Sequence, residues 1–150
     1  MTREEADCVF CRIVRRQAPA SFVFEDAQVV AFMDIFPSSP GHVLVVPARH
    51  AVTIWDLHEP EAAHLFAVAV RLARAIREAL QPNGLNVLQS NGRAAGQEVF
   101  HFHLHLIPRY GGEDGFRFRL RGPETPVPAR AELDAVAGRL RSALSASTAS

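Results

Sequence analysis

Short apolar runs separated by turn residues predict strands in the first third of the chain. Hydrophobic residues, many of them β-branched, dominate residues 21–25, 28–33 and 42–46, and Pro47 closes the third run. Short runs of this composition favour strands over helices. The first two runs meet at a turn around Asp26, so we expect them to form a hairpin.

Apolar residues at helical spacing predict one long helix between residues 60 and 80. Its first turn carries a proline and acidic residues, which suit a helix N-terminus. Shorter segments at 8–16 and 131–144 predict two more helices, and runs at 85–90 and 99–107 predict two more strands. This order of elements favours the α+β class.

The length of 150 residues is typical of one domain with one core. We therefore expect a single domain over 1–150, with its core at about 8–116. A C-terminal extension that contains a helix covers 117–144, and we expect residues 145–150 to form a frayed tail.

Composition and charge exclude several classes of protein. Hydrophobic residues make up 48% and charged residues 21% of the chain, as in an ordinary globular protein. Sixteen basic residues balance sixteen acidic ones, so we expect neither nucleic acid nor a membrane as a partner. Every basic residue is arginine, which excludes Schiff-base, P-loop and adenylated-lysine chemistry.

The hydropathy of the chain predicts a cytoplasmic location. No apolar run approaches the ~18 residues of a membrane span, and the N-terminal MTREEADC lacks the order of a signal peptide. Two cysteines in such a chain, Cys8 and Cys11, indicate a metal site, a redox pair or small buried side chains rather than a structural disulfide.

Three histidines alternate with apolar residues near residue 100. On a strand, His101, His103 and His105 would share one face while Phe102 and Leu104 enter the core. Neighbouring imidazoles are costly to protonate together, so we expect their pKa values to be lowered. Neutral rings of this kind serve as nucleophiles or as metal ligands.

Two other interpretations of these histidines stay open at this point. A metal-dependent hydrolase would use His103 and His105 as ligands and Glu98 as third ligand or base. An exposed strand that merely alternates histidine with apolar residues is the structural alternative.

The histidine segment and several upstream segments resemble the histidine-triad (HIT) family. HFHLHLI at 101–107, preceded by Gly-Gln, fits the family's His-φ-His-φ-His-φ-φ pattern, where φ is apolar. Segments 8–14, 24–26, 31–35 and 40–50 follow in the family's order, so the resemblance covers about 8–116. The sequence IPRYGGEDGF at 107–116 resembles the bacterial branch described as dinucleoside-polyphosphate-hydrolase-like.

The resemblance implies a fold and an assembly. The fold would be HIT-like, an antiparallel sheet with one long helix plus short N-terminal and C-terminal helices. Family members form homodimers with a sheet that extends across the pair, and we expect the same here.

The resemblance also implies hydrolysis or transfer of a nucleoside monophosphate at the α-phosphate, with no catalytic metal. His103 would attack phosphorus and form a nucleotidyl-histidine, and His105 would hold the phosphoryl oxygens. The expected ligand is a purine nucleotide conjugate, with AMP as the favoured product. The alternative is a nucleotide-binding or scaffold module in which turnover is incidental.

The rest of the nucleotide pocket is implied position by position. Asp34 would accept hydrogen bonds from the ribose hydroxyls, and His42 would orient the triad. The other implied contacts are Phe10, Ile13 and Phe32 around the base, Ile35 beside Asp34, and Asn91 and Gln97 at the phosphate or leaving group.

One position departs from the family pattern. Many relatives have Ser or Thr after Gly-Gln, whereas this chain has Glu98. If the carboxylate faces the site, it protonates a leaving group or repels a polyphosphate; if it faces outward, it is solvated surface.

The resemblance implies a structural zinc site as well. His50 and His101 would join Cys8 and Cys11 in a Cys₂His₂ set. Four protein ligands close a tetrahedral zinc and leave no position for water.

Overall fold

The structure is a computed structural model that describes residues 2–111 and 126–147. Its five strands form one antiparallel sheet in the order β1-β2-β3-β5-β4. The strands are β1 Phe22–Glu25, β2 Val29–Met33, β3 Val43–Pro47, β4 Gly84–Leu88 and β5 Leu104–Arg109. The helices are α1 Arg3–Asp7, α2 Val9–Val14, α3 Glu59–Leu80 and α4 Arg130–Ser147, with short 3₁₀ turns η1 Ile54–Asp56 and η2 Arg93–Ala95. The predicted α+β class, with an antiparallel sheet and one long helix, is confirmed.

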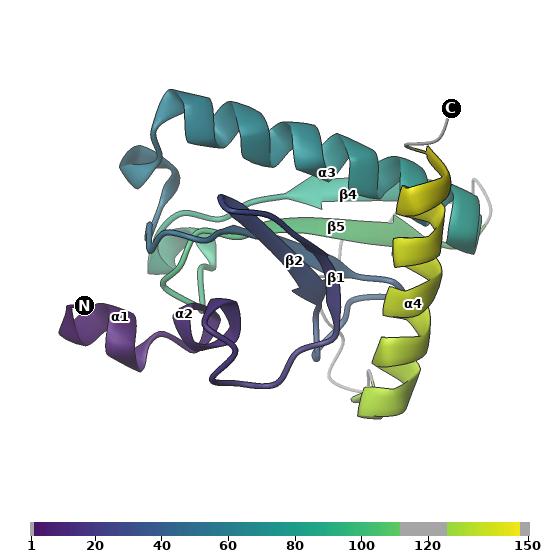
Figure 1. The fold of residues 1–150 in the computed structure, drawn as a ribbon, viewed down its shortest axis with the longest axis horizontal. Helices are drawn as coiled ribbons and strands as arrows, with labels where there is room; N and C mark the ends of the chain where they lie inside the picture. The colour runs from purple at the N-terminus through teal and green to yellow at the C-terminus, as the bar shows by residue number, and fades with distance from the viewer. Residues whose placement is uncertain (1, 112–125, 148–150) are drawn as a thin grey trace.

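The sheet is covered on both faces, and strand alternation divides its side chains between two apolar clusters. Every residue of β2 and β3 is buried. Val29, Ala31 and Met33 join the cluster under α3 and α4, whereas Val30 and Phe32 join the cluster under α2. Figure 1 shows α3 on one side of the sheet and the N-terminal helices on the other. Central strands buried on both faces explain why these runs are continuously hydrophobic.

The N-terminus forms two short helices instead of the one predicted at 8–16. Cys8 is both the C-cap of α1 and the N-cap of α2. In α2 its Sγ accepts a hydrogen bond from the Cys11 amide at 3.4 Å. Helix α1 was not predicted, although Thr2 and Glu5 form the capping box that marks a helix start.

The C-terminal helix is longer than predicted. It packs Leu133, Ala137 and Leu140 into the cluster beneath α3, as their helical spacing indicates. It continues to Ser147, so the frayed tail predicted at 145–150 was wrong for its first residues. The predictions for residues 112–125 and 148–150 lie outside the described residues.

A glycine directs the chain into β3. Gly41 has φ +89°, and a Cβ at this position would lie 2.3 Å from Leu80 Cδ1 and 3.2 Å from Pro108 Cγ. The positive φ favours glycine here, and a Cβ would in addition displace the end of the Leu80 side chain. The turn delivers His42, whose side chain is 2% exposed, to the start of the strand.

Within the described residues, no helix is long and apolar enough to cross a membrane.

Candidate functional site

The three histidines do not all lie on a strand, contrary to the sequence prediction. His105 is in β5, but His101 and His103 precede it in an irregular extended segment. The alternation persists, because Phe102 and Leu104 enter the core. His101 is fully buried, His103 is 8% exposed, and His105 is partly exposed. The segment therefore carries its imidazoles on the face of the sheet opposite α3.

Pro47 explains where the strand begins. The β3–β5 ladder runs from Val43↔Leu106 to Val45↔Leu104 and stops there. Pro47 has no amide hydrogen with which to continue it, and its carbonyl accepts the His101 Nε2–H at 2.9 Å. The backbone before Leu104 therefore makes its hydrogen bonds outside this ladder.

Two cysteines and two histidines gather around His101; we call them the Cys–His cluster (Cys8, Cys11, His50 and His101). His101 Nδ1 lies 3.5 Å from both Cys8 Sγ and Cys11 Sγ, and His50 Nδ1 lies 3.1 Å from Cys11 Sγ. All four donor atoms lie within 4.8 Å of one another. The sequence predicted this set of residues, and the fold brings it together.

The protonation of the Cys–His cluster suits a metal ion. Because the Pro47 carbonyl can only accept, His101 carries its proton on Nε2 and aims the Nδ1 lone pair at the thiols. Burial is the main cause that lowers the pKa of His101 to about 4, so the ring is neutral. Burial and then Cys8 raise the pKa of the Cys11 thiol to about 12. A bound cation reverses that shift by stabilising thiolates, and two sulfurs with two ring nitrogens form a closed zinc set.

His103 is oriented by the backbone of His101. Its Nδ1–H donates to the His101 carbonyl at 2.7 Å, so Nε2, on the far side of the ring, has the lone pair. The ring packs edge-on against Phe10 at 5.3 Å between centroids. Burial lowers the pKa of His103, and the hydrogen bond to the His101 carbonyl and then the charges of Asp34 and Glu98 act in the opposite direction. His103 is thus a neutral base or nucleophile with a fixed tautomer.

His42 and His105 form a hydrogen-bonded pair with the opposite arrangement. The Ser38 amide donates to His42 Nδ1 at 3.0 Å, so the neutral His42 ring has its proton on Nε2. Nε2–H then donates to His105 Nδ1 at 2.9 Å. His105 must therefore have its own proton on Nε2, as a hydrogen-bond donor.

Lowered pKa values among these histidines were predicted, but from mutual repulsion. Burial is instead the first cause for His42 and His105, and the charges of neighbouring groups come after it. The pKa of each ring falls to about 3. Both rings are therefore neutral near pH 7.

Asp34 adjoins this pair at the end of β2. Its Oδ1 accepts the Phe36 amide at 2.8 Å, and its Oδ2 lies 3.5 Å from His42 Nε2. Asp34, His42, His103 and His105 are called the His–Asp cluster below. Ile35, next in the chain, is 42% exposed and open to a ligand.

The residues implied for the base pocket share one cluster. Phe10, Ile13 and Phe32 are buried together, and the Phe10 and Phe32 rings meet edge-on at 5.3 Å. They form a packed apolar surface next to His103, called the apolar floor below, and not an open cleft between two opposed side chains.

The comparisons with known proteins agree on one family. The HIT domain matches residues 15–112. The chain belongs to the HIT family. Protein hit from Bacillus subtilis is 44% identical over 110 residues, which are 73% of this chain and 76% of that protein.

Solved structures of HIT proteins share the fold over nearly the whole chain. A zinc-bound histidine triad family protein from Mycobacterium smegmatis aligns with a TM-score of 0.80 and 37% identity, over 97% of this chain and 98% of that one. A hypothetical histidine triad nucleotide-binding protein from Sulfolobus tokodaii aligns with a TM-score of 0.82 and 30% identity, over 93% of each chain.

The side-chain amides of Asn91 and Gln97, expected at the phosphate, form hydrogen bonds to the backbone of the HIT domain. Gln97 Oε1 accepts the Gly92 amide at 2.7 Å, and its Nε2 donates to the Val52 carbonyl at 2.6 Å. Asn91 Oδ1 accepts the Ile54 amide at 2.7 Å. Both side chains therefore hold the loop around η2 against the segment that carries η1.

The position that departs from the family pattern faces solvent. Glu98 is exposed, yet its charge is close enough to raise the pKa of His103 against the effect of burial. A ligand on His103 would therefore meet this carboxylate at the edge of the site.

The metal arrangement considered for a hydrolase does not form. In the described part of the chain, two groups of donors are close enough to hold an ion: the Cys–His cluster, and Asp34 with His42 and His105. His103 and Glu98 belong to neither. In the second group the His42 Nε2 proton already occupies the space between the donors.

Sequence reasoning missed the backbone groups that orient the rings. Ser38 and Pro47 each fix one histidine tautomer, through an amide and a carbonyl. Backbone partners carry no signature of their own, although Pro47, at the end of an apolar run, could have indicated that the ladder stops there.

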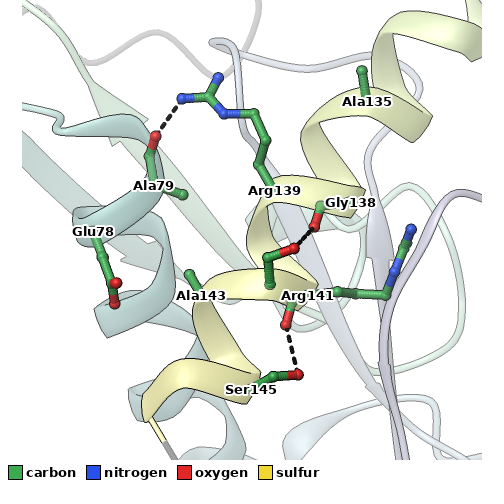
Figure 2. A pocket seen from close by; sticks show the side chains of 9 residues that line it. Glu78, Ala79, Ala135, Gly138, Arg139, Arg141, Ala143 and Ser145 are labelled. Carbon is green, nitrogen blue, oxygen red and sulfur yellow. Dashed lines mark hydrogen bonds between the residues drawn. The ribbon is translucent and has the colours of Figure 1, made fainter.

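An open groove elsewhere on the protein carries no comparable chemistry. It lies between the end of α3 and α4, where the Arg139 guanidinium donates to the Ala79 carbonyl (Figure 2). None of its lining residues belongs to either histidine cluster.

Proposed function

We propose that this HIT protein is a nucleotidyl hydrolase or transferase that cleaves purine nucleotide conjugates at the α-phosphate. The observation that carries the proposal is the fixed tautomer of His103. Its Nδ1–H is bonded to the His101 carbonyl, which leaves a neutral ring with a lone pair on Nε2. A scaffold that only binds nucleotide has no need of such a group.

The reaction has two displacements at phosphorus. His103 Nε2 attacks the α-phosphorus, a nitrogen–phosphorus bond forms, and the bond to the leaving group breaks with its electron pair. The leaving group takes up a proton. Water then attacks the nucleotidyl-histidine, loses a proton, and releases the nucleoside monophosphate with His103 neutral again. Two inversions give net retention of configuration.

His105 supplies a donor for the charge that develops on the phosphoryl oxygens. The relay from Ser38 through His42 leaves His105 with a proton on Nε2. A donor set before the reaction costs no reorganisation in the transition state. Hydrogen bonding thus accounts for the complementary roles of His103 and His105.

Asp34 and the apolar floor would hold the nucleoside. The Asp34 carboxylate suits a ribose diol, and Phe10, Ile13 and Phe32 offer apolar contact that distinguishes purines poorly. The Sulfolobus tokodaii neighbour is named a nucleotide-binding protein, which supports a nucleotide here. AMP is the favoured product.

A structural zinc would stabilise the fold behind the nucleophile. Cys8, Cys11, His50 and His101 would hold it, and it would supply a cross-link between α2 and the segment that carries the histidines. The proposed reaction uses no catalytic metal, because the His105 Nε2–H would supply the donor for the phosphoryl oxygens.

A homodimer would cover an apolar surface at the edge of the sheet. β4 is an edge strand, and its Val87 is 49% exposed. On α3, Phe66 and Val70 lie one turn apart on an exposed flank, and Phe66 is 56% exposed. Phe66→Glu combined with Val87→Glu should give monomers in light scattering.

The test is AMP release from a panel of substrates. The panel contains adenosine phosphoramidate, a diadenosine polyphosphate, an adenylylated amino acid and ADP. Wild type should release AMP from at least one, and His103→Ala should abolish release while His58→Ala, at an exposed histidine, should not. Bound AMP without turnover, or equal release by His103→Ala, would assign the protein to the binding modules.

A further inference from the structure

The single proton on His42 Nε2 has two acceptors in front of it. His105 Nδ1 lies at 2.9 Å and Asp34 Oδ2 at 3.5 Å. The Ser38 amide holds the ring in the tautomer that places the proton there. His42 is 2% exposed, so the choice of acceptor is made within the protein.

The competitor is the residue that faces the ligand. The Asp34 side chain is 15% exposed, so a bound ribose can reach its carboxylate. An anionic acceptor attracts a shared N–H more strongly than a neutral ring nitrogen does. Hydroxyls that donate to the carboxylate weaken that attraction, because they satisfy its lone pairs.

We propose that Asp34 is a positioning residue that couples ribose recognition to the catalytic histidines through His42. When the ribose hydroxyls donate to Asp34, the His42 Nε2–H bonds to His105 alone. His105 is then held with its own Nε2–H directed at the phosphoryl oxygens. The inference rests on the proposed function and names its substrate class: conjugates with an intact ribose diol.

The coupling has a kinetic signature that simple binding lacks. Lost uniform binding raises KM and leaves kcat unchanged, whereas a lost transition-state contact lowers kcat. Removal of the diol should therefore lower kcat by about tenfold, the usual size for one charged hydrogen bond, in addition to any rise in KM.

The experiment compares adenosine 5′-phosphoramidate with its 2′,3′-dideoxy analogue. In wild type the kcat ratio should be about ten, and in Asp34→Asn it should fall to about one, because a neutral amide competes weakly for the His42 proton. Asp26→Asn is the matched control: Asp26 pairs with His64 at 2.7 Å, outside both clusters, so the ratio should stay at the wild-type value.

A second measurement does not depend on turnover. In protein labelled with ¹⁵N-histidine, the chemical shift of the His42 Nε2–H resonance should change on addition of AMP but not of 2′,3′-dideoxy-AMP. Equal kcat values for both substrates in wild type, an unchanged ratio in Asp34→Asn, or no shift with AMP would overturn the coupling. If no substrate is turned over, the proposed function fails and the AMP shift alone decides the coupling.

Discussion

The Cys–His cluster and the His–Asp cluster are made from the same kind of ring and differ in which nitrogen is protonated. His101 donates from Nε2 to the Pro47 carbonyl and directs Nδ1 at two thiols. His103, two residues later, donates from Nδ1 to the His101 carbonyl and keeps its lone pair on Nε2. The lone pair of His101 is placed to bind a metal ion, and the lone pair of His103 suits the proposed attack on phosphorus.

This difference shows that the role of a buried histidine depends on the hydrogen-bond partner of the ring nitrogen that faces away from the site. Burial lowers the pKa values of His101, His103 and His105, so charge does not distinguish these three rings. The hydrogen bond that His101 and His103 each make to a backbone carbonyl distinguishes these two rings, because it selects the tautomer. The two clusters also meet at His101, whose side chain serves one cluster and whose carbonyl orients His103.

The largest expected effect comes from removal of the metal ligands. Cys8→Ser with Cys11→Ser should lower bound zinc from about one equivalent to less than about a tenth, because a hydroxyl does not replace a thiolate. Loss of several kcal/mol should lower Tm by about 10 °C or more. Metal analysis and calorimetry would check this. An unchanged Tm after zinc loss would deny the metal its structural role.

The next effect isolates the other cluster. His105→Ala should lower kcat by about a hundredfold or more, the usual cost of one transition-state donor. Zinc content should stay at the wild-type level, because His105 is not among its ligands. His58→Ala is the control. A variant that lost zinc as well would show that the two clusters are not separable.

Much of the site was predictable from the sequence because strand alternation survives outside a strand. Phe102 and Leu104 enter the core as predicted, although hydrogen bonding in the sheet begins only at Leu104. Alternation follows from extended backbone, whether or not a partner strand is present. The residues of the Cys–His cluster were predicted from the family pattern, because that pattern consists of residue types and does not depend on ring orientation.

Ring orientation could not be predicted, because it depends on distant backbone groups. The carbonyl that orients His101 belongs to Pro47, and the amide that orients His42 belongs to Ser38. The start of β5 was also missed, because the Phe102 amide donates to the Ala51 carbonyl, outside the ladder. Its one signal in the sequence was Pro47.

A smaller effect should appear in the pH dependence of stability. Folding lowers the pKa of His42 and His105 from about 6.5 to about 3, so the unfolded chain binds more protons between these values. Stability is then complete above pH ~6.5 and is lost as pH falls toward ~3, by ~1 kcal/mol per pH unit for each ring.

The check is urea unfolding of wild type and His42→Gln from pH 7.5 to 5. The slope of unfolding free energy against pH should be smaller in the variant by about one proton. Acid effects on the zinc ligands are common to both proteins and cancel in the difference. Equal slopes would mean that His42 is protonated as easily in the fold as in the unfolded chain.

The smallest effect concerns Glu98, at the border of the His–Asp cluster. Its carboxylate acts on His103 from an exposed position, so it should repel an anionic polyphosphate leaving group more than an amine. Glu98→Ser should raise kcat/KM for a diadenosine polyphosphate relative to a phosphoramidate by about threefold, and the gain should shrink in high salt. Glu78→Ser, on the far end of α3, is the matched control. An unchanged ratio would make Glu98 solvated surface, and the fixed tautomers of His103 and His105 would then act on both leaving groups alike.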